Sequence, residues 1–447
     1  MKSETVKTVI LACLIGLSFL LTLAIWNYQP NIEPNDDNEE AMEAIFTNGE
    51  QETKKNIVQP FNVIYHLEGN EHTGYADKSK EKQLYEQMQS WSLYDFNTDY
   101  SGEGLQKYDS PYVELIFPTE LPADIIADVF TVDETTSLPN SSFDRIYVSL
   151  NKDISERQVI FKSAQSDITI SANIQNPEDE INEVLNTYNS GEESPIDYIP
   201  YEVNNDQVVY LPNKVDMKEL AFRYRIIPIE PLKTVLFTNP SNVISAEEIP
   251  KVERFTDGDR EMIYYDEKYM EFTDMVNSDI TEENLEGTEL LDQTLKFIND
   301  HNGWTSEGKY EFVLSELNQS SKTVQFRRVY SGFPVYKSNE LSVISVTWNN
   351  QNIYKYSRPL IQLDDAYQVN KKTLEDVDSI ISTLENSPEY KSKTILDVAL
   401  GYKLEEGEFD QYFKLTPTWF IKDYSGWSEF IPLDQKVGGV HNAMGSN

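Results

Sequence analysis

The sequence has 447 residues, a net charge of −39, 39% hydrophobic residues, 12% aromatic residues and a single cysteine. The acidity argues against nucleic acid or anionic lipid as a ligand of the polar part of the chain, and the apolar content excludes a wholly disordered chain. Because Cys13 is the only cysteine and lies in the first apolar run, disulfide and thiolate chemistry are excluded from the rest.

The first predicted element is an apolar helix around Val9–Trp26, an 18-residue run inside a charge-free segment. At about 1.5 Å per residue, this run nearly crosses a hydrocarbon core of about 30 Å. It is longer than the roughly 7–15 apolar residues of a secretory signal. Cys13 opens the run, whereas a lipoprotein cysteine would close it. We therefore predict a transmembrane helix at residues 8–28, with Trp26 and Tyr28 as membrane-interface anchors.

The charges that flank this helix predict its orientation. Lys2 and Lys7 precede it, whereas residues 27–53 contain eight acids and neither Lys nor Arg. The positive-inside rule places residues 1–7 in the cytoplasm and the bulk of the chain outside a single-pass cell membrane. The polar residues 29–56 are expected to form an acidic linker.

An N-terminal ectodomain is predicted at residues 57–190. It should contain a strand at 61–66 and a strand at 112–117 that ends at Pro118. Between them a helix is predicted at 80–91, with Leu84, Tyr85, Met88 and Trp91 on one apolar face. Strict alternation in 145–150, 158–162 and 167–171 predicts an antiparallel meander. An acidic helix is expected at 178–188.

Two further domains are expected after a turn-rich break, a middle α+β domain at 191–283 and a C-terminal α+β domain at 284–434. The C-terminal domain should open with a helix at 289–301 capped by Thr288, and Thr373 with Asp376 should form a capping box before a second helix. Residues 435–447 are expected to be a flexible tail. The predicted fold class is α+β, with mainly antiparallel sheets and packed helices.

No catalytic, metal-binding or cofactor-binding residue is predicted. His66 and His72 are six residues apart but lack a recognisable zinc pattern. The pairs Ser79/Lys82 and Ser149/Lys152 match S-x-x-K without its partner motifs. The acids that begin at Asp257 lack the glycine and terminal glutamate of a calcium loop. Carboxylate pairs are too numerous in this chain to discriminate a glycosidase.

Four sequence strings suggest a family. They are Val6–Leu11 leading to Trp26–Asn27, Phe222–Arg225 before a Pro-containing helix, Tyr330–Tyr336, and Val346–Trp348 continuing to Tyr356–Leu360. The order of these strings and the predicted topology resemble those of the YycH family of Gram-positive bacteria. The resemblance implies a non-enzymatic regulator of the essential cell-wall sensor histidine kinase WalK/YycG, acting with a YycI-like single-span partner.

The resemblance also implies contacts between transmembrane helices, for which small residues allow close approach. Ala12 and Gly16 are four residues apart on one face, and Ser18 and Thr22 on another. One face is expected to pack on the YycI-like helix and the other on a kinase span. Two alternatives remain open: an extracytoplasmic module that senses a cell-envelope ligand, and a carboxylate-based cell-wall hydrolase.

Overall fold

A computed structural model of the chain describes residues 49–432 apart from 101–110, 134–135, 151–157, most of 176–194, 204–206, 277–284, 307–309, 337–340 and 408–411. The chain divides into two compact units, residues 1–43 and 44–447, and every described residue belongs to the second. The predicted transmembrane helix and tail, residues 29–48 of the predicted linker and about half of the predicted acidic helix lie outside the described residues.

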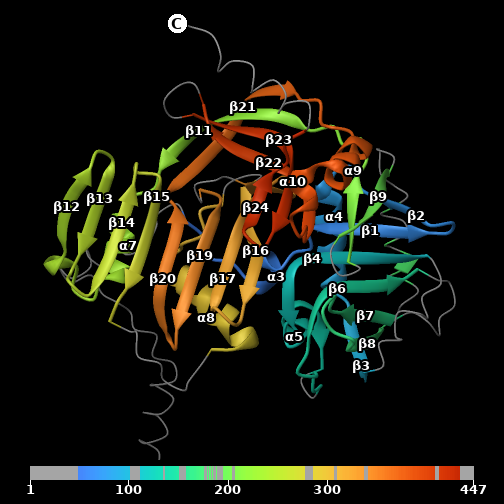
Figure 1. The fold of residues 1–447 in the computed structure, drawn as a ribbon. Coiled ribbons are helices and arrows are strands. Elements are labelled where there is room, and N and C mark those ends of the chain that lie inside the picture. Colours follow the sequence, from blue (N-terminus) through green and yellow to red (C-terminus); the bar gives the residue numbers. More distant parts are fainter. Residues whose placement is uncertain are drawn as a thin grey trace, which may run out of the picture. The chain divides into compact units, whose positions relative to one another are not determined.

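Ten strands form the first sheet, in the order β10-β9-β2-β1-β4-β6-β7-β8-β3-β5 (Figure 1). Their bounds are β1 Asn62–Leu67, β2 Glu71–Gly74, β3 Ser92–Asp99, β4 Tyr112–Pro122, β5 Thr131–Val132, β6 Ser142–Ser149, β7 Gln158–Lys162, β8 Thr169–Ile174, β9 Ile196–Glu202 and β10 Val208–Pro212. The helices whose bounds are described in the same stretch of chain are α3 Lys54–Ile57, α4 Lys78–Met88 and α5 Ile125–Val129.

The predicted meander is confirmed, because β6, β7 and β8 pair in order and antiparallel. The predicted apolar face of α4 is also confirmed, since Leu84, Tyr85 and Met88 are buried. The predicted strand end at Pro118 is wrong, because β4 continues to Pro122. The ladder between β4 and β6 is irregular between Ile116 and Leu121. A residue without an N–H is tolerated in such an interruption.

Fourteen strands form the second sheet, in the order β12-β13-β14-β15-β20-β19-β17-β18-β22-β23-β11-β21, with β16 paired to β17 and β24 to β23. Their bounds are β11 Lys218–Ile226, β12 Ile244–Ile249, β13 Val252–Thr256, β14 Arg260–Tyr265, β15 Tyr269–Asp274, β16 Tyr310–Asn318, β17 Thr323–Tyr330, β18 Phe333–Tyr336, β19 Val343–Asn349, β20 Asn352–Pro359, β21 Ile361–Lys371, β22 Asp397–Glu406, β23 Tyr412–Asp423 and β24 Gly426–Glu429. The helices are α7 Glu230–Leu236, η4 Pro240–Asn242, α8 Gly287–Asp300, α9 Val377–Asn386 and α10 Pro388–Lys391. Mostly antiparallel sheets with few helices make this an α+β fold.

Both predicted helix caps in the C-terminal part need correction. Helix α8 begins at Gly287 after Glu286, so Thr288 lies inside the first turn, and its hydroxyl has no partner. Asp376 is itself the N-cap of α9 and accepts a hydrogen bond from the N–H of Asp378. It therefore fills the role that the sequence assigned to Thr373.

The strands of the predicted middle domain, residues 191–283, are divided between the two sheets. β9 and β10 extend the first sheet, whereas β11 and β12 to β15 belong to the second. Two apolar cores result, and Val209 and Leu211 of β10 pack in the core built mainly by the second sheet and α9. β10 therefore connects the first sheet to the second core. The predicted domain limits themselves stay predictions.

Candidate functional site

The residues predicted to contact partners are Ala12, Gly16, Ser18 and Thr22, and the predicted membrane anchors are Trp26 and Tyr28. All six lie outside the described residues. Within the part of the chain that the structure describes, no helix is long and apolar enough to cross a membrane. The structure instead brings together two polar sites that the sequence did not predict.

The first site is a buried polar cluster on one face of β1, β2, β4 and β6. His66 of β1 lies directly opposite His72 of β2, with 3.0 Å between their Nδ1 atoms. The Nε2 atom of His66 lies 2.8 Å from Oε2 of Glu114 on β4. Arg145 of β6 donates through Nη1 to Oε1 of the same carboxylate. One chain of polar contacts therefore crosses four strands.

Alternation along the strands explains why this cluster is polar. Val63 and Tyr65 of β1 point into the first apolar core, so His66 is on the opposite face with Glu114 and Arg145. That face is nevertheless closed, since His66 is 3% exposed, Glu114 2% and Arg145 7%. Buried charges are retained where they are paired, as these are.

Aromatic rings enclose the cluster. The ring of Tyr112 stacks on His66 with centroids 4.3 Å apart, and Tyr147 donates from its hydroxyl to Glu114 over 3.2 Å. Tyr210 of β10 lies across both imidazoles, 5.3 Å from the ring of His66 and 5.2 Å from that of His72. β10 is held there by Arg145, whose Nη2 donates to the carbonyl of Val208 over 3.2 Å.

The environment changes the acidity of these groups. Burial opposes the charge of Glu114, but the hydrogen bond from His66 and the charge of Arg145 outweigh it and lower the pKa of the carboxyl. Burial, followed by the charge of His66, lowers the pKa of His72. Burial and then the charge of Glu114 raise the pKa of Tyr112 to about 12. The site therefore favours an ionised Glu114, a neutral His72 and a protonated Tyr112 at neutral pH.

The second site is a cleft of about 350 Å³ between α4 and the β16–β17 region. Its wall contains Lys78, which is buried and donates to both oxygens of Glu81, at 2.9 and 3.0 Å. At the cleft, Lys82 of α4 forms an ion pair with Glu311 of β16. Burial raises the pKa of Glu81 to about 7, although Lys78 opposes the rise.

A glycine turn closes this cleft. Ser331 and Gly332 join β17 to β18 with positive φ angles of 48° and 80°. A Cβ atom at Gly332 would overlap the Cβ of Lys78, so only glycine allows this turn to lie against α4. The turn and the Lys82–Glu311 ion pair thus connect α4 to the second sheet.

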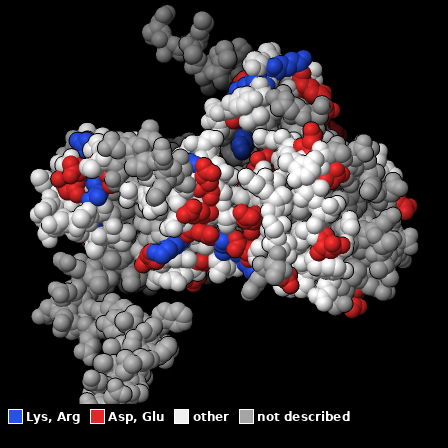
Figure 2. Space-filling model, turned by 90° about the horizontal axis from the view of Figure 1, so that it is seen from below, with Lys and Arg blue, Asp and Glu red and all other residues white. Residues whose placement is uncertain are grey.

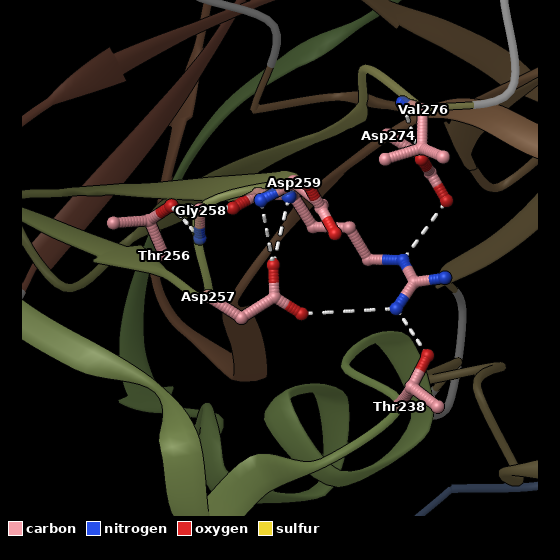
Figure 3. A network of polar contacts seen from close by, with 8 residues as sticks. Thr238, Thr256, Asp257, Gly258, Asp259, Asp274 and Val276 are labelled. Carbon is pink, nitrogen blue, oxygen red and sulfur yellow. Dashed lines mark hydrogen bonds and ion pairs between the residues drawn. The ribbon is translucent and has the colours of Figure 1, made fainter.

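The Ser79/Lys82 and calcium-loop patterns gain no chemical support, and Lys152 of the other S-x-x-K match lies outside the described residues. Lys82, the potential base of Ser79, is bound to Glu311. Asp257 accepts hydrogen bonds from the N–H groups of Asp259 and Arg260, at 3.1 and 2.8 Å, and Arg260 also binds Asp274 (Figure 3). These acids stabilise a turn. Over the described ranges, no group of three or more His, Cys, Asp and Glu side chains could hold a metal ion.

Surface charge agrees with the composition. Figure 2 shows that acidic side chains outnumber basic ones on the face seen there. That surface does not resemble the basic patches that bind nucleic acid.

The fold and these sites define a sheet-rich α+β protein in which buried charged groups hold strands together. The chain belongs to the YycH family: the family model "YycH protein, N-terminal domain" matches residues 4–190, and "YycH protein, C-terminal domain" matches residues 206–438.

A curated relative and a solved structure agree with this assignment. The chain is 22% identical over 443 residues to the "Two-component system WalR/WalK regulatory protein YycH" of Bacillus subtilis (strain 168), covering 94% of this chain and 95% of that protein. The crystal structure of YycH from Bacillus subtilis has the same fold, with a TM-score of 0.64 at 19% identity, covering 86% of this chain and 98% of that one.

Proposed function

We propose that this protein is an accessory regulator of a WalR/WalK-type two-component system and that it acts by binding other proteins. The observation that carries the proposal is the match to a protein named as such a regulator over nearly the full length of both chains. Its two polar sites agree with a role in binding other proteins, because the charged side chains in them form ion pairs within the chain.

We further propose that residues 8–28 anchor the protein in the cell membrane, with residues 1–7 in the cytoplasm and the rest outside. The support is the charge-free apolar run and the absence of Lys and Arg in residues 27–53. A cysteine-labelling assay with a membrane-impermeant reagent on intact cells tests the topology. A cysteine introduced at Ser3 should be protected from the reagent, and one introduced at Asn48 should be labelled. The reverse pattern would contradict the proposed orientation.

The proposed partners are a YycI-like single-span protein and a WalK/YycG-like sensor kinase that controls cell-wall metabolism. Ala12 with Gly16, and Ser18 with Thr22, form the two small-residue faces proposed to contact these spans. Contacts outside the membrane are proposed as well, since most of the chain folds into the two sheets.

A carboxylate-based hydrolase gains no support from the cleft. Glu81 is bound by Lys78 and Glu311 by Lys82, so neither is a free acid or base. A ligand-sensing module is favoured by one observation, a cleft whose volume of about 350 Å³ is within the range of small-molecule sites.

The regulatory proposal is tested by complementation in a cell that lacks the chromosomal gene. A WalR-dependent promoter reports kinase output after expression of the full chain, residues 1–56 alone, or the full chain with an unrelated span. Full regulation by residues 1–56 would assign the activity to the span and exclude the hydrolase and sensing alternatives. A promoter unaffected by gene loss would contradict the proposal.

A further inference from the structure

The His66–His72 pair has a limited capacity for protons. Glu114, as a carboxylate, accepts only, so Nε2 of His66 carries the hydrogen atom that binds it. The Nδ1 atom of His66 is then the acceptor for Nδ1–H of His72, 3.0 Å away. The pair can take one extra proton on Nε2 of His72 and keep this contact. A further proton would place N–H groups on both facing Nδ1 atoms and abolish it.

Among the described residues, Glu114 is the acid that acts on the charge of His72, so it would have to compensate for both imidazolium rings. Arg145 is already positive, and the charge of Glu114 is shared between Arg145 and His66. Tyr112, Tyr147 and Tyr210 face the pair from β4, β6 and β10, and burial raises the pKa of each. Asp144 of β6 and Asp397 of β22 also interact with Arg145, but burial raises the pKa of both carboxyls.

β10 is positioned to respond to the pair. Its Tyr210 covers both imidazoles, whereas Val209 and Leu211, its neighbours on the opposite face, pack in the second core. β9 and β2 share only two residue pairs, Thr73 with Asp197 and Gly74 with Ile196, so the ladder that holds β9 and β10 to the first sheet is short. His72 is only half-buried and can move outward.

We propose that the His66–His72 pair is a proton-controlled switch that releases β10 from the first sheet when both rings become charged. At neutral pH the His72–His66–Glu114–Arg145 chain holds β10 between the first sheet and the second core. In acid, repulsion drives His72 outward and loosens the Tyr210 contact, so the connection between the two sheets weakens. The inference is independent of which partner the protein regulates.

Hydrogen exchange measured by mass spectrometry on the full chain tests the switch at pH 7.5 and 5.0, after correction for the intrinsic rates. In the wild type, we expect protection of Val208–Pro212 to fall several-fold at pH 5.0, because the release of β10 exposes its backbone N–H groups. His72→Gln keeps a neutral hydrogen-bonding side chain and should lose this pH dependence. His72→Lys, whose ammonium can donate to Nδ1 of a neutral His66, should keep protection at pH 7.5 and lose it at pH 5.0.

Two comparisons separate the switch from general unfolding. Protection of β13 and β14 should stay unchanged in every variant, and His441→Gln should behave as the wild type. Equal protection of Val208–Pro212 at both pH values in the wild type would overturn the proposal. The same pH-dependent loss in His72→Gln would also overturn it.

Discussion

His66 and Glu114 form the centre of the buried cluster, with Nε2 of the imidazole 2.8 Å from Oε2 of the carboxylate and both side chains almost fully enclosed. The carboxylate also binds Arg145 and Tyr147, so a single acid connects three strands. Because its partners on β1 and β6 depend on it, Glu114 should contribute more to stability than any exposed acid of this chain.

Glu114→Gln should therefore lower the free energy of unfolding by about 3 kcal/mol at pH 7, since it leaves the buried Arg145 without its anion. The pKa of Glu114 is lowered in the folded protein, so its contribution is present above the unfolded pKa and is lost as pH falls through the folded pKa. Urea unfolding at pH 7 and pH 3.5 measures the difference, which should shrink in acid. Glu71→Gln, an exposed acid on the neighbouring strand β2, should change stability by less than about 0.5 kcal/mol.

Gly332→Ala should destabilise the protein more than Gly69→Ala. Their φ angles are 80° and 83°, so both variants incur the left-handed strain of about 1–2 kcal/mol. A Cβ at Gly69 meets nothing within 4 Å, whereas one at Gly332 would overlap Lys78. Gly332→Ala should cost roughly 1–3 kcal/mol more in denaturant unfolding. Equal losses would show that the turn does not pack against α4.

His301 should make the protein less stable in acid. Burial, followed by the charge of Arg358, lowers the pKa of His301 to about 3. The unfolded chain takes up this proton near its ordinary pKa of about 6.5, so stability falls by about 1.4 kcal/mol per pH unit below that value. His301→Gln removes this loss of stability in acid. The stability difference between wild type and variant should shift by about 2.5 kcal/mol in favour of the variant between pH 6.5 and 4.5. A constant difference would contradict the lowered pKa.

Bulky substitutions in the predicted transmembrane helix should weaken association with other spans. Ala12→Ile with Gly16→Ile should reduce the YycI-like partner or the kinase that co-purifies by more than about tenfold, because close helix approach is lost. Ser18→Ile with Thr22→Ile should reduce co-purification of whichever of the two partners the first pair of substitutions leaves unchanged. Leu14→Ile, which preserves size, is the control. Unchanged recovery of both partners would exclude these faces.

The local elements were largely predictable because their signals are short-range. Strict alternation predicted β6, β7 and β8, and helical spacing predicted the buried face of α4. The prediction of a strand end at Pro118 failed because a ladder irregularity, which depends on the partner strand, accommodates proline. The Thr288 cap failed because the helix begins at Gly287, with a φ of 56°, two residues before the predicted start.

The buried cluster was only partly visible in the sequence. His66 and His72 are placed symmetrically about a turn that contains Gly69 and Asn70. A β-hairpin predicted at this turn would have paired them. Glu114 and Arg145 carried a weaker signal, a charge within an otherwise apolar alternating run. Nothing in the sequence brought these four residues together, because sheet order is decided by non-local pairing.

By itself, the sequence determined the α+β class, most strand and helix positions, the absence of disulfides after Cys13 and the family resemblance, since these depend on composition, periodicity and the order of local strings. Only the tertiary structure decided that β9 and β10 join the first sheet, that Lys78 packs against Gly332, and that Glu114 links His66 to Arg145. The physical reason is that a strand's partner, and the cover over its second face, depend on residues far away in the chain. Once that face is covered, a charged side chain on it is costly unless it is paired.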